Sequence, residues 1–329
     1  MSDAPGPPLR IFADLPLTPS AECLLQEGAA GHELMLSRSP SSSMLASAAT
    51  DPRLLSAEIL FGQPDPAAIA RAPNVKWIQI SSSGITRYDN PEFRAQMAAR
   101  RIPVCNSAHV FADSCALHVF SFILAQARQL PVALKSRCPH GEAEWHALRG
   151  SCTPPEHQTV LILGYGAIGE RLAEMLAPLN MQVQAYRRQA RGNEKVPIVT
   201  ADGLARALAQ ADHVVNILPD SQQTRLFFNA ARFSAVKPGA IFYNIGRGGT
   251  VDQDALLAAL NARRIAAAWL DVTEPEPLPE GHPLLSHPHC FITPHIAGGH
   301  TDEVGHIVRH FLDNLQRFVS GQPLFDRVM

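Results

Sequence analysis

The chain has 329 residues, 46% of them hydrophobic and 18% charged, with a formal net charge of -2 at pH 7. That length suits one large or two ordinary globular domains, and a charge so near zero argues against a nucleic-acid-binding surface. We expect no membrane segment, because no apolar run reaches the ~18 residues that would span a bilayer. The six cysteines form no C-x-x-C pair, which favours reduced thiols in the cytoplasm over a disulfide framework or a metal site.

Residues 1–111 alternate short apolar runs with helical patterns, which predicts an α/β layer of its own. A small loop with Ser82, Ser83 and Gly84 follows one of these runs. A glycine-containing loop at the carboxyl end of a strand can point backbone N–H groups at an anion, although a plain turn has the same composition. The runs that we expect to form strands are 9–13, 57–61, 75–80 and 102–105.

The segment 112–130 is a long apolar stretch without Gly or Pro, and Pro131 follows it. This pattern predicts a helix that ends before the proline. Such a helix either connects two domains or lies in a core. We assign no specific role to residues 131–157.

Residues 159–169 read Thr-Val-Leu-Ile-Leu-Gly-Tyr-Gly-Ala-Ile-Gly and are the most informative part of the chain. The apolar run predicts a buried strand, and a helical pattern begins directly after the glycines. A strand, a G-x-G-x-x-G turn and a helix in this order are typical of a dinucleotide-binding unit. Gly164 would allow the tight turn, Gly166 would let the backbone approach a pyrophosphate, and Gly169 would let the helix pack on the strand.

The chain beyond the glycine turn repeats strand and helix, which predicts a mostly parallel, doubly wound sheet. Ligands of such sheets bind beyond the carboxyl ends of the strands. A final helical pattern, at about 301–319, has no strand after it, and we expect it to return to the first domain. The expected strands are 181–186, 198–200, 213–219, 240–245, 265–270 and 290–293, with helices at 201–210, 225–232 and 253–262.

Charged side chains follow the last three predicted strands, where each strand ends: Arg247, then Asp271 and Glu276, then His295. An arginine held by glycines can bind a carboxylate in a two-pronged bond. A histidine is the natural proton donor to a carbonyl near neutral pH, and a carboxylate beside it would favour the imidazolium and orient the ring. On a nucleotide-binding sheet, this combination at three strand ends predicts the reduction of a ketone rather than a set of unrelated surface charges.

From about residue 55 to 310 the chain resembles the D-isomer-specific 2-hydroxyacid dehydrogenases, and among them it looks most like the NADP-dependent glyoxylate and hydroxypyruvate reductases. The likeness lies in N-x-G-R-G around Arg247, in Asp271 followed by Glu276, and in P-H-x-x-G around His295. The resemblance implies that Arg247, Glu276 and His295 are the catalytic residues. It also implies that the protein is a homodimer.

The resemblance further implies a reaction in which the nicotinamide of NAD(P)H gives a hydride to a small 2-oxoacid such as glyoxylate or hydroxypyruvate. His295 would give the proton to the forming alkoxide, and Glu276 would support His295. Arg247 would hold the carboxylate and the carbonyl oxygen. Glu274 is a neighbouring carboxylate that we do not expect to take part.

The implied fold is a doubly wound, Rossmann-type cofactor domain inserted into a second, flavodoxin-like α/β domain that binds substrate. We expect the cofactor domain to span 112–296 and the substrate domain to combine 1–111 with 297–329. The implied substrate contacts are Ser82, Ser83, Gly84, Arg247 and His295. The residues expected to contact the dinucleotide are Gly164, Gly166, Ala167, Ile168, Gly169, Arg187, Arg188, Leu218, Pro219, Thr224 and Asp271, the last through the nicotinamide carboxamide.

The end of the second strand of the nucleotide-binding unit indicates the cofactor. NAD-binding Rossmann units carry an acidic residue there, ~20 residues beyond the glycines, which binds the ribose hydroxyls. This chain has Arg187 and Arg188 at that place, and Glu194 lies too far along the following loop. Arg187 can pair with a 2′-phosphate, and Arg188 can stack on adenine or assist. We therefore expect NADPH to be preferred and NADH to be possible.

Two other interpretations stay open at this point. Transcriptional corepressors that resemble this family keep the fold and the triad but act as non-catalytic dinucleotide sensors; long disordered tails would favour that role, and this sequence has none. Phosphite and formate dehydrogenases share the fold, but the formate enzymes typically have Gln at the position of Glu276. Turnover of a 2-oxoacid would separate an enzyme from a sensor.

Overall fold

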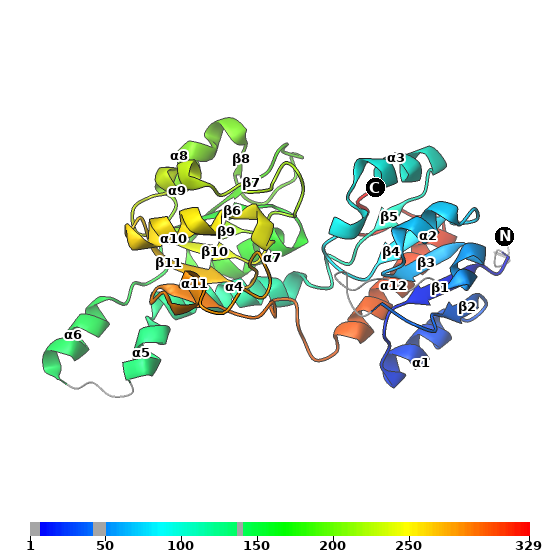
Figure 1. Ribbon diagram of the computed structural model, residues 1–329, viewed down its shortest axis with the longest axis horizontal. Coiled ribbons are helices and arrows are strands. Elements are labelled where there is room, and N and C mark those ends of the chain that lie inside the picture. Colours follow the sequence, from blue (N-terminus) through cyan, green and yellow to red (C-terminus); the bar gives the residue numbers. More distant parts are fainter. Residues whose placement is uncertain (1–6, 42–50, 137–140) are drawn as a thin grey trace. The chain divides into compact units, whose positions relative to one another are not determined.

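The computed structural model describes residues 7–41, 51–136 and 141–329 (Figure 1). The chain divides into two compact units, Met1–Phe111 with His300–Met329, and Ala112–Gly299. The chain returns to the first unit at His300, where the sequence analysis expects the return at 297.

The first unit contains a parallel sheet with the strand order β2-β1-β3-β4-β5. This order is the one found in flavodoxin-like folds. β2 was not predicted from the sequence, because its apolar run is only three residues long, Leu34 to Leu36, and none of its four residues is fully buried. The strands are β1 (Arg10–Asp14), β2 (Glu33–Leu36), β3 (Ile59–Gly62), β4 (Trp77–Ile80) and β5 (Val104–Cys105).

Helices cover both faces of this sheet, as the alternation along β3 requires. Ile59 and Phe61 pack on the side of α1 and α12, and Leu60 packs on the side of α2 and α3. Phe61 stacks on Phe311 of α12 with ring centroids 4.1 Å apart, so the last helix of the chain belongs to this unit. The helices are α1 (Pro19–Gly28), η1 (Pro52–Ser56), α2 (Pro66–Arg71), η2 (Thr86–Tyr88), α3 (Pro91–Arg100) and α12 (Glu303–Val319).

The second unit contains a seven-stranded parallel sheet with the order β12-β11-β10-β9-β6-β7-β8. The glycine-turn strand β6 lies between β9 and β7, so the strand order reverses at β6, where doubly wound sheets bind their ligands. The strands are β6 (Thr159–Leu163), β7 (Gln182–Tyr186), β8 (Ile198–Val199), β9 (His213–Asn216), β10 (Ala240–Asn244), β11 (Ile265–Leu270) and β12 (Cys290–Ile292).

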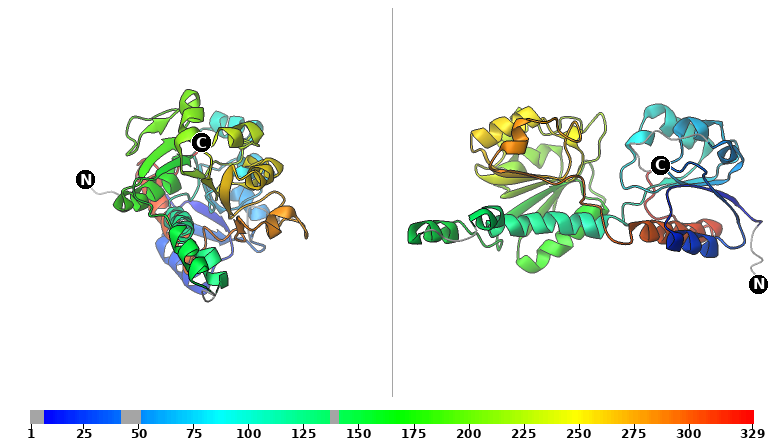
Figure 2. Two further views of the ribbon diagram at one scale, coloured as in Figure 1. Left: turned by 90° about the vertical axis from the view of Figure 1, so that its left-hand side faces the viewer. Right: turned by 60° about the horizontal axis from the view of Figure 1, so that its bottom comes forward.

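Figure 2 shows α8, α9 and α10 on one face of this sheet and α4 with α7 on the other. The predicted helix at 225–232 is wrong in its position: α9 begins at Ala230, capped by Asn229, and Leu226 has a positive φ of 48° that a helix excludes. The helices of this unit are α4 (Ala112–Ala127), α7 (Ala167–Leu176), η3 (Ala177–Leu179), η4 (Ala201–Gly203), α8 (Leu204–Gln210), α9 (Ala230–Ala235), η5 (Gly248–Thr250), α10 (Gln253–Asn261) and α11 (Pro283–Ser286).

Two further helices, α5 (Leu130–Ser136) and α6 (Glu142–Gly150), extend away from the sheet of this unit (Figure 1). Neither contains a buried residue. None of the described helices is by itself long and apolar enough to cross a membrane, and only α4 with α5, bent by 60° at their junction, meets that criterion as a pair.

Candidate active site and dinucleotide site

At two positions of the turn after β6, the backbone geometry requires glycine. Gly164 has a φ of +99°, and a Cβ there would lie 2.9 Å from the carbonyl oxygen of Ile217. A Cβ on Gly169 would lie 2.5 Å from the carbonyl oxygen of Gly164, which is closer than any real side chain comes. Both positions therefore exclude a side chain, and α7 approaches the turn closely because Gly169 has none.

The start of α7 is open to a ligand. Gly166 is the N-cap residue, no side chain accepts from the first N–H groups, and a Cβ on Gly166 would meet no atom within 4 Å. Ala167 and Ile168 begin the helix, so their N–H groups lack helical partners. An uncapped helix start beside empty space is a site for a phosphate group, and this cradle fits the pyrophosphate of a dinucleotide.

A pocket of about 730 Å³ lies beside this turn, within the second unit. The segment around Thr224 forms one wall of this pocket. Its shape is held by the Thr224 hydroxyl, which accepts from Ser221 N over 2.9 Å and donates to Pro219 O over 2.5 Å. Ala167, Ile168, Gly169 and Asp271 do not line this pocket. The expected dinucleotide contacts that do line it are Gly164, Gly166, Arg187, Arg188, Leu218, Pro219 and Thr224.

The loop after β7 folds back toward the end of that strand. Glu194 folds back onto Arg187, with 3.0 Å between Oε1 and Nη1, and its side chain is only 5% exposed. The backbone N–H groups of Arg191 and Gly192 also donate to this carboxylate, and these bonds, led by that of Arg191, lower the pKa of Glu194. The loop turns at Gly192 and brings Glu194 beside Arg187, but Glu194 does not line the pocket, so the expectation that it takes no part in binding the ribose stays a prediction.

The candidate catalytic residues follow three adjacent strands. The sheet places β10, β11 and β12 side by side and parallel, and Arg247, Glu276 and His295 follow them in that order. Because the carboxyl ends of parallel strands lie at one edge of a sheet, loops that are far apart in sequence meet there.

His295 and Glu276 contact each other directly. Nδ1 of His295 lies 2.5 Å from Oε1 of Glu276, and the two side chains are 42% and 31% exposed. Oε2 of Glu276 accepts from the backbone N of Thr273 over 3.4 Å. The side chain of the neighbouring Glu274 instead lies 3.9 Å from Arg225, and its backbone N donates to Gln253 Oε1. Of the two glutamates, Glu276 is the one that can orient the histidine ring. Because Glu276 contacts Nδ1, Nε2 is the ring nitrogen that this contact does not use.

Arg247 is half-buried in the same cluster. Its Nη1 donates to the carbonyl oxygen of Gly246 over 2.7 Å. Burial lowers the pKa of Arg247, while Asp220, Glu276 and Cys115 act in the opposite direction. An arginine keeps its proton under such a shift, so this side chain is a positive charge with donors to spare for a carboxylate.

Asp271 directly follows β11 and is buried at the same edge of the sheet. Its side chain is 1% exposed, and its oxygens accept from Thr293 Oγ1 at 2.6 Å and from the backbone N of Ile296 and Ala297, both at 2.9 Å. Nε2 of His118 lies 3.6 Å from the carboxylate, and burial lowers the pKa of His118 although Asp271 opposes this. The expected contact of Asp271 with a nicotinamide carboxamide stays a prediction.

The loop Ser82, Ser83 and Gly84 lies in the first unit, after β4. The hydroxyl of Ser82 donates to the carbonyl oxygen of Gly84 over 2.7 Å and accepts from Gln63 Nε2 over 3.0 Å. A side chain therefore ties the two ends of this short loop together.

Two side chains near the dinucleotide pocket were not predicted to contact the two arginines: Glu194, and Gln223, whose Oε1 accepts from Arg188 Nη1 over 2.5 Å. No local pattern marks either of them. The three glycines and the two arginines, in contrast, stand at fixed offsets from a strand and could be found.

A seven-stranded sheet with a glycine turn where its strand order reverses defines a dinucleotide-binding α/β protein. Residues 120–297 match the NAD binding domain of the D-isomer specific 2-hydroxyacid dehydrogenases.

Two curated relatives and one solved structure extend the match. The glyoxylate reductase/hydroxypyruvate reductase of Homo sapiens is 34% identical over 260 residues, which are 78% of this chain and 77% of that protein. The glyoxylate/hydroxypyruvate reductase B of Citrobacter koseri is 33% identical over 276 residues, 81% of this chain and 83% of that protein. The NADPH-dependent glyoxylate/hydroxypyruvate reductase of Sinorhizobium meliloti, solved with NADP and sulfate, has a TM-score of 0.74 and 26% identity, covering 97% of this chain and 98% of its own.

The chain belongs to the D-isomer specific 2-hydroxyacid dehydrogenase family and is an oxidoreductase that uses NAD(P). The family and the fold class expected from the sequence are both confirmed.

Proposed function

We propose that the protein reduces a small 2-oxoacid to the 2-hydroxyacid with NAD(P)H, and that Arg247, Glu276 and His295 are its catalytic residues. The observation that supports this most strongly is the contact between His295 and Glu276, 2.5 Å apart, at the sheet edge where Arg247 also lies. A half-exposed imidazole with one nitrogen held by a carboxylate can donate a proton through its other nitrogen.

In the proposed reaction the bound cofactor supplies a hydride to the carbonyl carbon. His295 gives its proton to the carbonyl oxygen, and Glu276 keeps the imidazole oriented. Arg247 binds the substrate carboxylate and the carbonyl oxygen, which neutralises the charge that develops there. Ser82, Ser83 and Gly84 are proposed to offer backbone N–H groups to the substrate carboxylate.

Arg187 supports a preference for NADPH. Its side chain lines the pocket, and a guanidinium has five N–H donors, so it can keep Nη1 on Glu194 and offer other donors to a 2′-phosphate. Glu194 fixes the guanidinium in place, although its charge also opposes a phosphate nearby. Arg188 is proposed to assist at the adenine end of the pocket.

Glyoxylate and hydroxypyruvate are the substrates that we propose, because relatives at 33% and 34% identity are named for them. Steady-state assays with glyoxylate, hydroxypyruvate, pyruvate and phenylpyruvate, each with NADPH and with NADH, test this directly. The highest kcat/KM is expected for glyoxylate or hydroxypyruvate with NADPH. Absence of turnover with every 2-oxoacid would contradict the proposal and favour a dinucleotide sensor.

We propose that a second copy of the chain covers α5 and α6. These helices bury no residue, yet they carry Leu130, Val132, Leu134 and Trp145, and Leu134 is 74% exposed. Apolar side chains gathered on a projecting arm are typical of an interface between copies. Light scattering should give the mass of a dimer, and Leu134→Glu should shift the protein toward the monomer.

The thiols are consistent with a reducing compartment, and we propose the cytoplasm. Cys23, Cys105, Cys152 and Cys290 form no disulfide in the part of the chain that the structure describes.

A further inference from the structure

The last residues of the chain add an edge to the sheet of the first unit. Arg327 pairs antiparallel with Cys105 of β5, and Val328 N donates to Val104 O over 2.8 Å. One step further, the backbone N of Asn106 donates to the carbonyl oxygen of Asp326 over 3.0 Å. The C-terminal segment thereby reaches the turn that follows β5.

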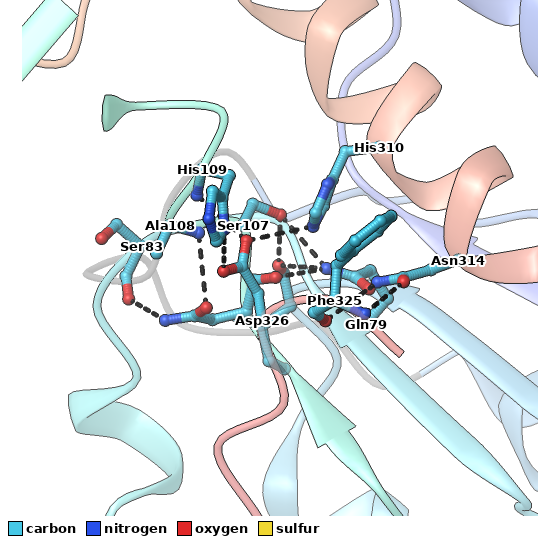
Figure 3. A network of polar contacts seen from close by, with 11 residues as sticks. Gln79, Ser83, Ser107, Ala108, His109, His310, Asn314, Phe325 and Asp326 are labelled. Carbon is cyan, nitrogen blue, oxygen red and sulfur yellow. Dashed lines mark hydrogen bonds and ion pairs between the residues drawn. The ribbon is translucent and has the colours of Figure 1, made fainter. Parts of the chain in front are cut away.

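Asp326 is a buried carboxylate in this segment, with a side chain 5% exposed (Figure 3). Its Oδ2 accepts from the backbone N of His109 over 3.0 Å and lies 3.2 Å from Nε2 of His310. Its Oδ1 contacts Nδ1 of His109. Burial alone raises the pKa of Asp326, but the bonds from His109 and His310 hold it below its ordinary range. Asp326 is therefore a negative charge that ties α12 to the turn after β5.

Two buried side-chain amides, Asn314 and Gln79, make a second connection between α12 and the turn after β5. Asn314 of α12 donates to Gln79 Oε1 over 2.9 Å and accepts from the backbone N of Phe325 over 2.8 Å. Gln79 in turn donates to the carbonyl oxygen of Asn106 over 2.6 Å. Asn314 and Gln79 are fully buried, so these bonds have no competition from water.

The turn after β5 holds the proposed substrate loop. Asn106 Nδ2 donates to the carbonyl oxygen of Ser83 over 2.6 Å, and Ser107 N donates to the carbonyl oxygen of Ser82 over 3.0 Å. In a planar trans peptide, a carbonyl and the N–H of the next residue point in opposite directions. With both carbonyls held toward Asn106 and Ser107, the N–H groups of Ser83 and Gly84 point the other way. Successive N–H groups on one side form an anion-binding concavity.

We propose that Asp326 is a positioning residue for substrate binding: by fixing the turn that carries Asn106 and Ser107, it aims the N–H groups of Ser83 and Gly84 at the carboxylate of the 2-oxoacid. This inference rests on the proposed function. It makes the C-terminal segment a determinant of substrate affinity, although it contributes no side chain to the reacting atoms.

The test compares Asp326→Asn with the wild type in three measurements. The KM for glyoxylate should rise about tenfold, the size expected when one charge-assisted hydrogen bond is lost. The kcat at saturating glyoxylate should change little, and so should the Kd for NADPH measured by fluorescence, because the dinucleotide site lies in the other unit. Arg327→Gln is the matched control, since the hydrogen bond that the structure describes for this neighbouring side chain goes to Met329 O.

A double-mutant cycle with Asn106→Ala separates a positioning role from general loss of stability. If Asp326 acts through Asn106, the second substitution should add little to the first. Additive effects, an unchanged KM, or a Kd for NADPH that rises with the KM would each overturn the inference. Should Asp326→Asn fail to fold, His109→Gln, whose ring is 64% exposed, is expected to raise the KM in the same direction.

Different results would contradict the proposed function and the proposed role of Asp326. A wild type that turns over no 2-oxoacid contradicts the proposed function. A wild type that turns over glyoxylate, with an Asp326→Asn variant of unchanged KM, contradicts only the role of Asp326.

Discussion

Asp271 holds the turn that presents His295. The carbonyl oxygen of Asp271 accepts from the backbone N of His295 over 3.0 Å, and its carboxylate accepts from the two residues that follow, each over 2.9 Å. His295 has a φ of +53°, a conformation that costs a residue with a side chain about 1–3 kcal/mol. The strained backbone at the proposed proton donor is therefore stabilised by one buried carboxylate.

Asp271→Asn should lower kcat about 10- to 100-fold, because an amide offers one acceptor where the turn needs two, and loss of a charge-assisted bond has that size. Thr293→Val should cost less, since it removes the 2.6 Å side-chain bond but leaves the two backbone bonds. Steady-state kinetics and NADPH titration check both variants. A Kd for NADPH that rises as far as kcat falls would instead support the carboxamide contact of Asp271.

His295→Ala and Arg247→Ala should each lower kcat/KM for 2-oxoacid reduction by ~10²–10⁴, the usual range for a positioned acid–base or charged group. Glu276→Gln should cost less than His295→Ala, because the imidazole remains. Glu274→Gln is the matched control, since the side chain of Glu274 lies near Arg225, whereas that of Glu276 contacts His295. Near-wild-type turnover by either alanine variant would show that the assignment is wrong.

Most of the fold could be predicted because parallel sheets bury their strands on both faces. β6, β9 and β11 are apolar runs that local composition reveals, and parallel topology then brings Arg247, Glu276 and His295 to one edge without further information. β2 was not predicted, since its apolar run is only three residues long and the strand is half-exposed.

Long-range side-chain pairs could not be predicted either. Glu194 reaches Arg187 only because its loop turns back, and Asp326 meets His109 across 217 positions of sequence. Both contacts depend on the tertiary fold, and neither residue stands in a pattern that marks it.

The preference for NADPH over NADH should change in opposite directions when the two residues of the Arg187–Glu194 ion pair are substituted in turn. Wild-type kcat/KM should favour NADPH over NADH by at least about tenfold, and Arg187→Ala should remove that preference by deleting a charge-assisted bond to the 2′-phosphate. Glu194→Gln should increase the preference, because it frees the guanidinium and removes a negative charge beside the phosphate. Equal use of both cofactors by the wild type would refute this role of Arg187.

Gly169→Ala should impair the fold, whereas Gly166→Ala should impair dinucleotide binding. A Cβ at Gly169 lies 2.5 Å from Gly164 O, so Gly169→Ala should lower the melting temperature and displace α7. A Cβ at Gly166 meets no protein atom within 4 Å, so Gly166→Ala should fold but occupy the space of the pyrophosphate. Thermal unfolding and NADPH titration separate the two. A Gly166→Ala variant that binds NADPH as well as the wild type would contradict the proposed cradle.

His213 should make the stability of the protein depend on pH. It is 3% exposed, and its ring contacts Tyr243 Oη at 2.9 Å and Gln158 Oε1 at 2.7 Å. Burial lowers the pKa of His213 to about 4, against the smaller opposing effect of Asp212. Between the ordinary histidine pKa of about 6.5 and this value, the unfolded chain binds a proton that the folded chain does not.

The free energy of unfolding should therefore fall by up to about 3 kcal/mol as the pH drops from about 6.5 to about 4, and that contribution is fully present above about 6.5. Urea unfolding at several pH values measures this slope. His213→Gln should flatten it, because glutamine does not titrate, whereas Tyr243→Phe should lower stability and keep the slope, since the imidazole stays buried. If His213→Gln has the same pH dependence as the wild type, the loss of stability in acid has another origin.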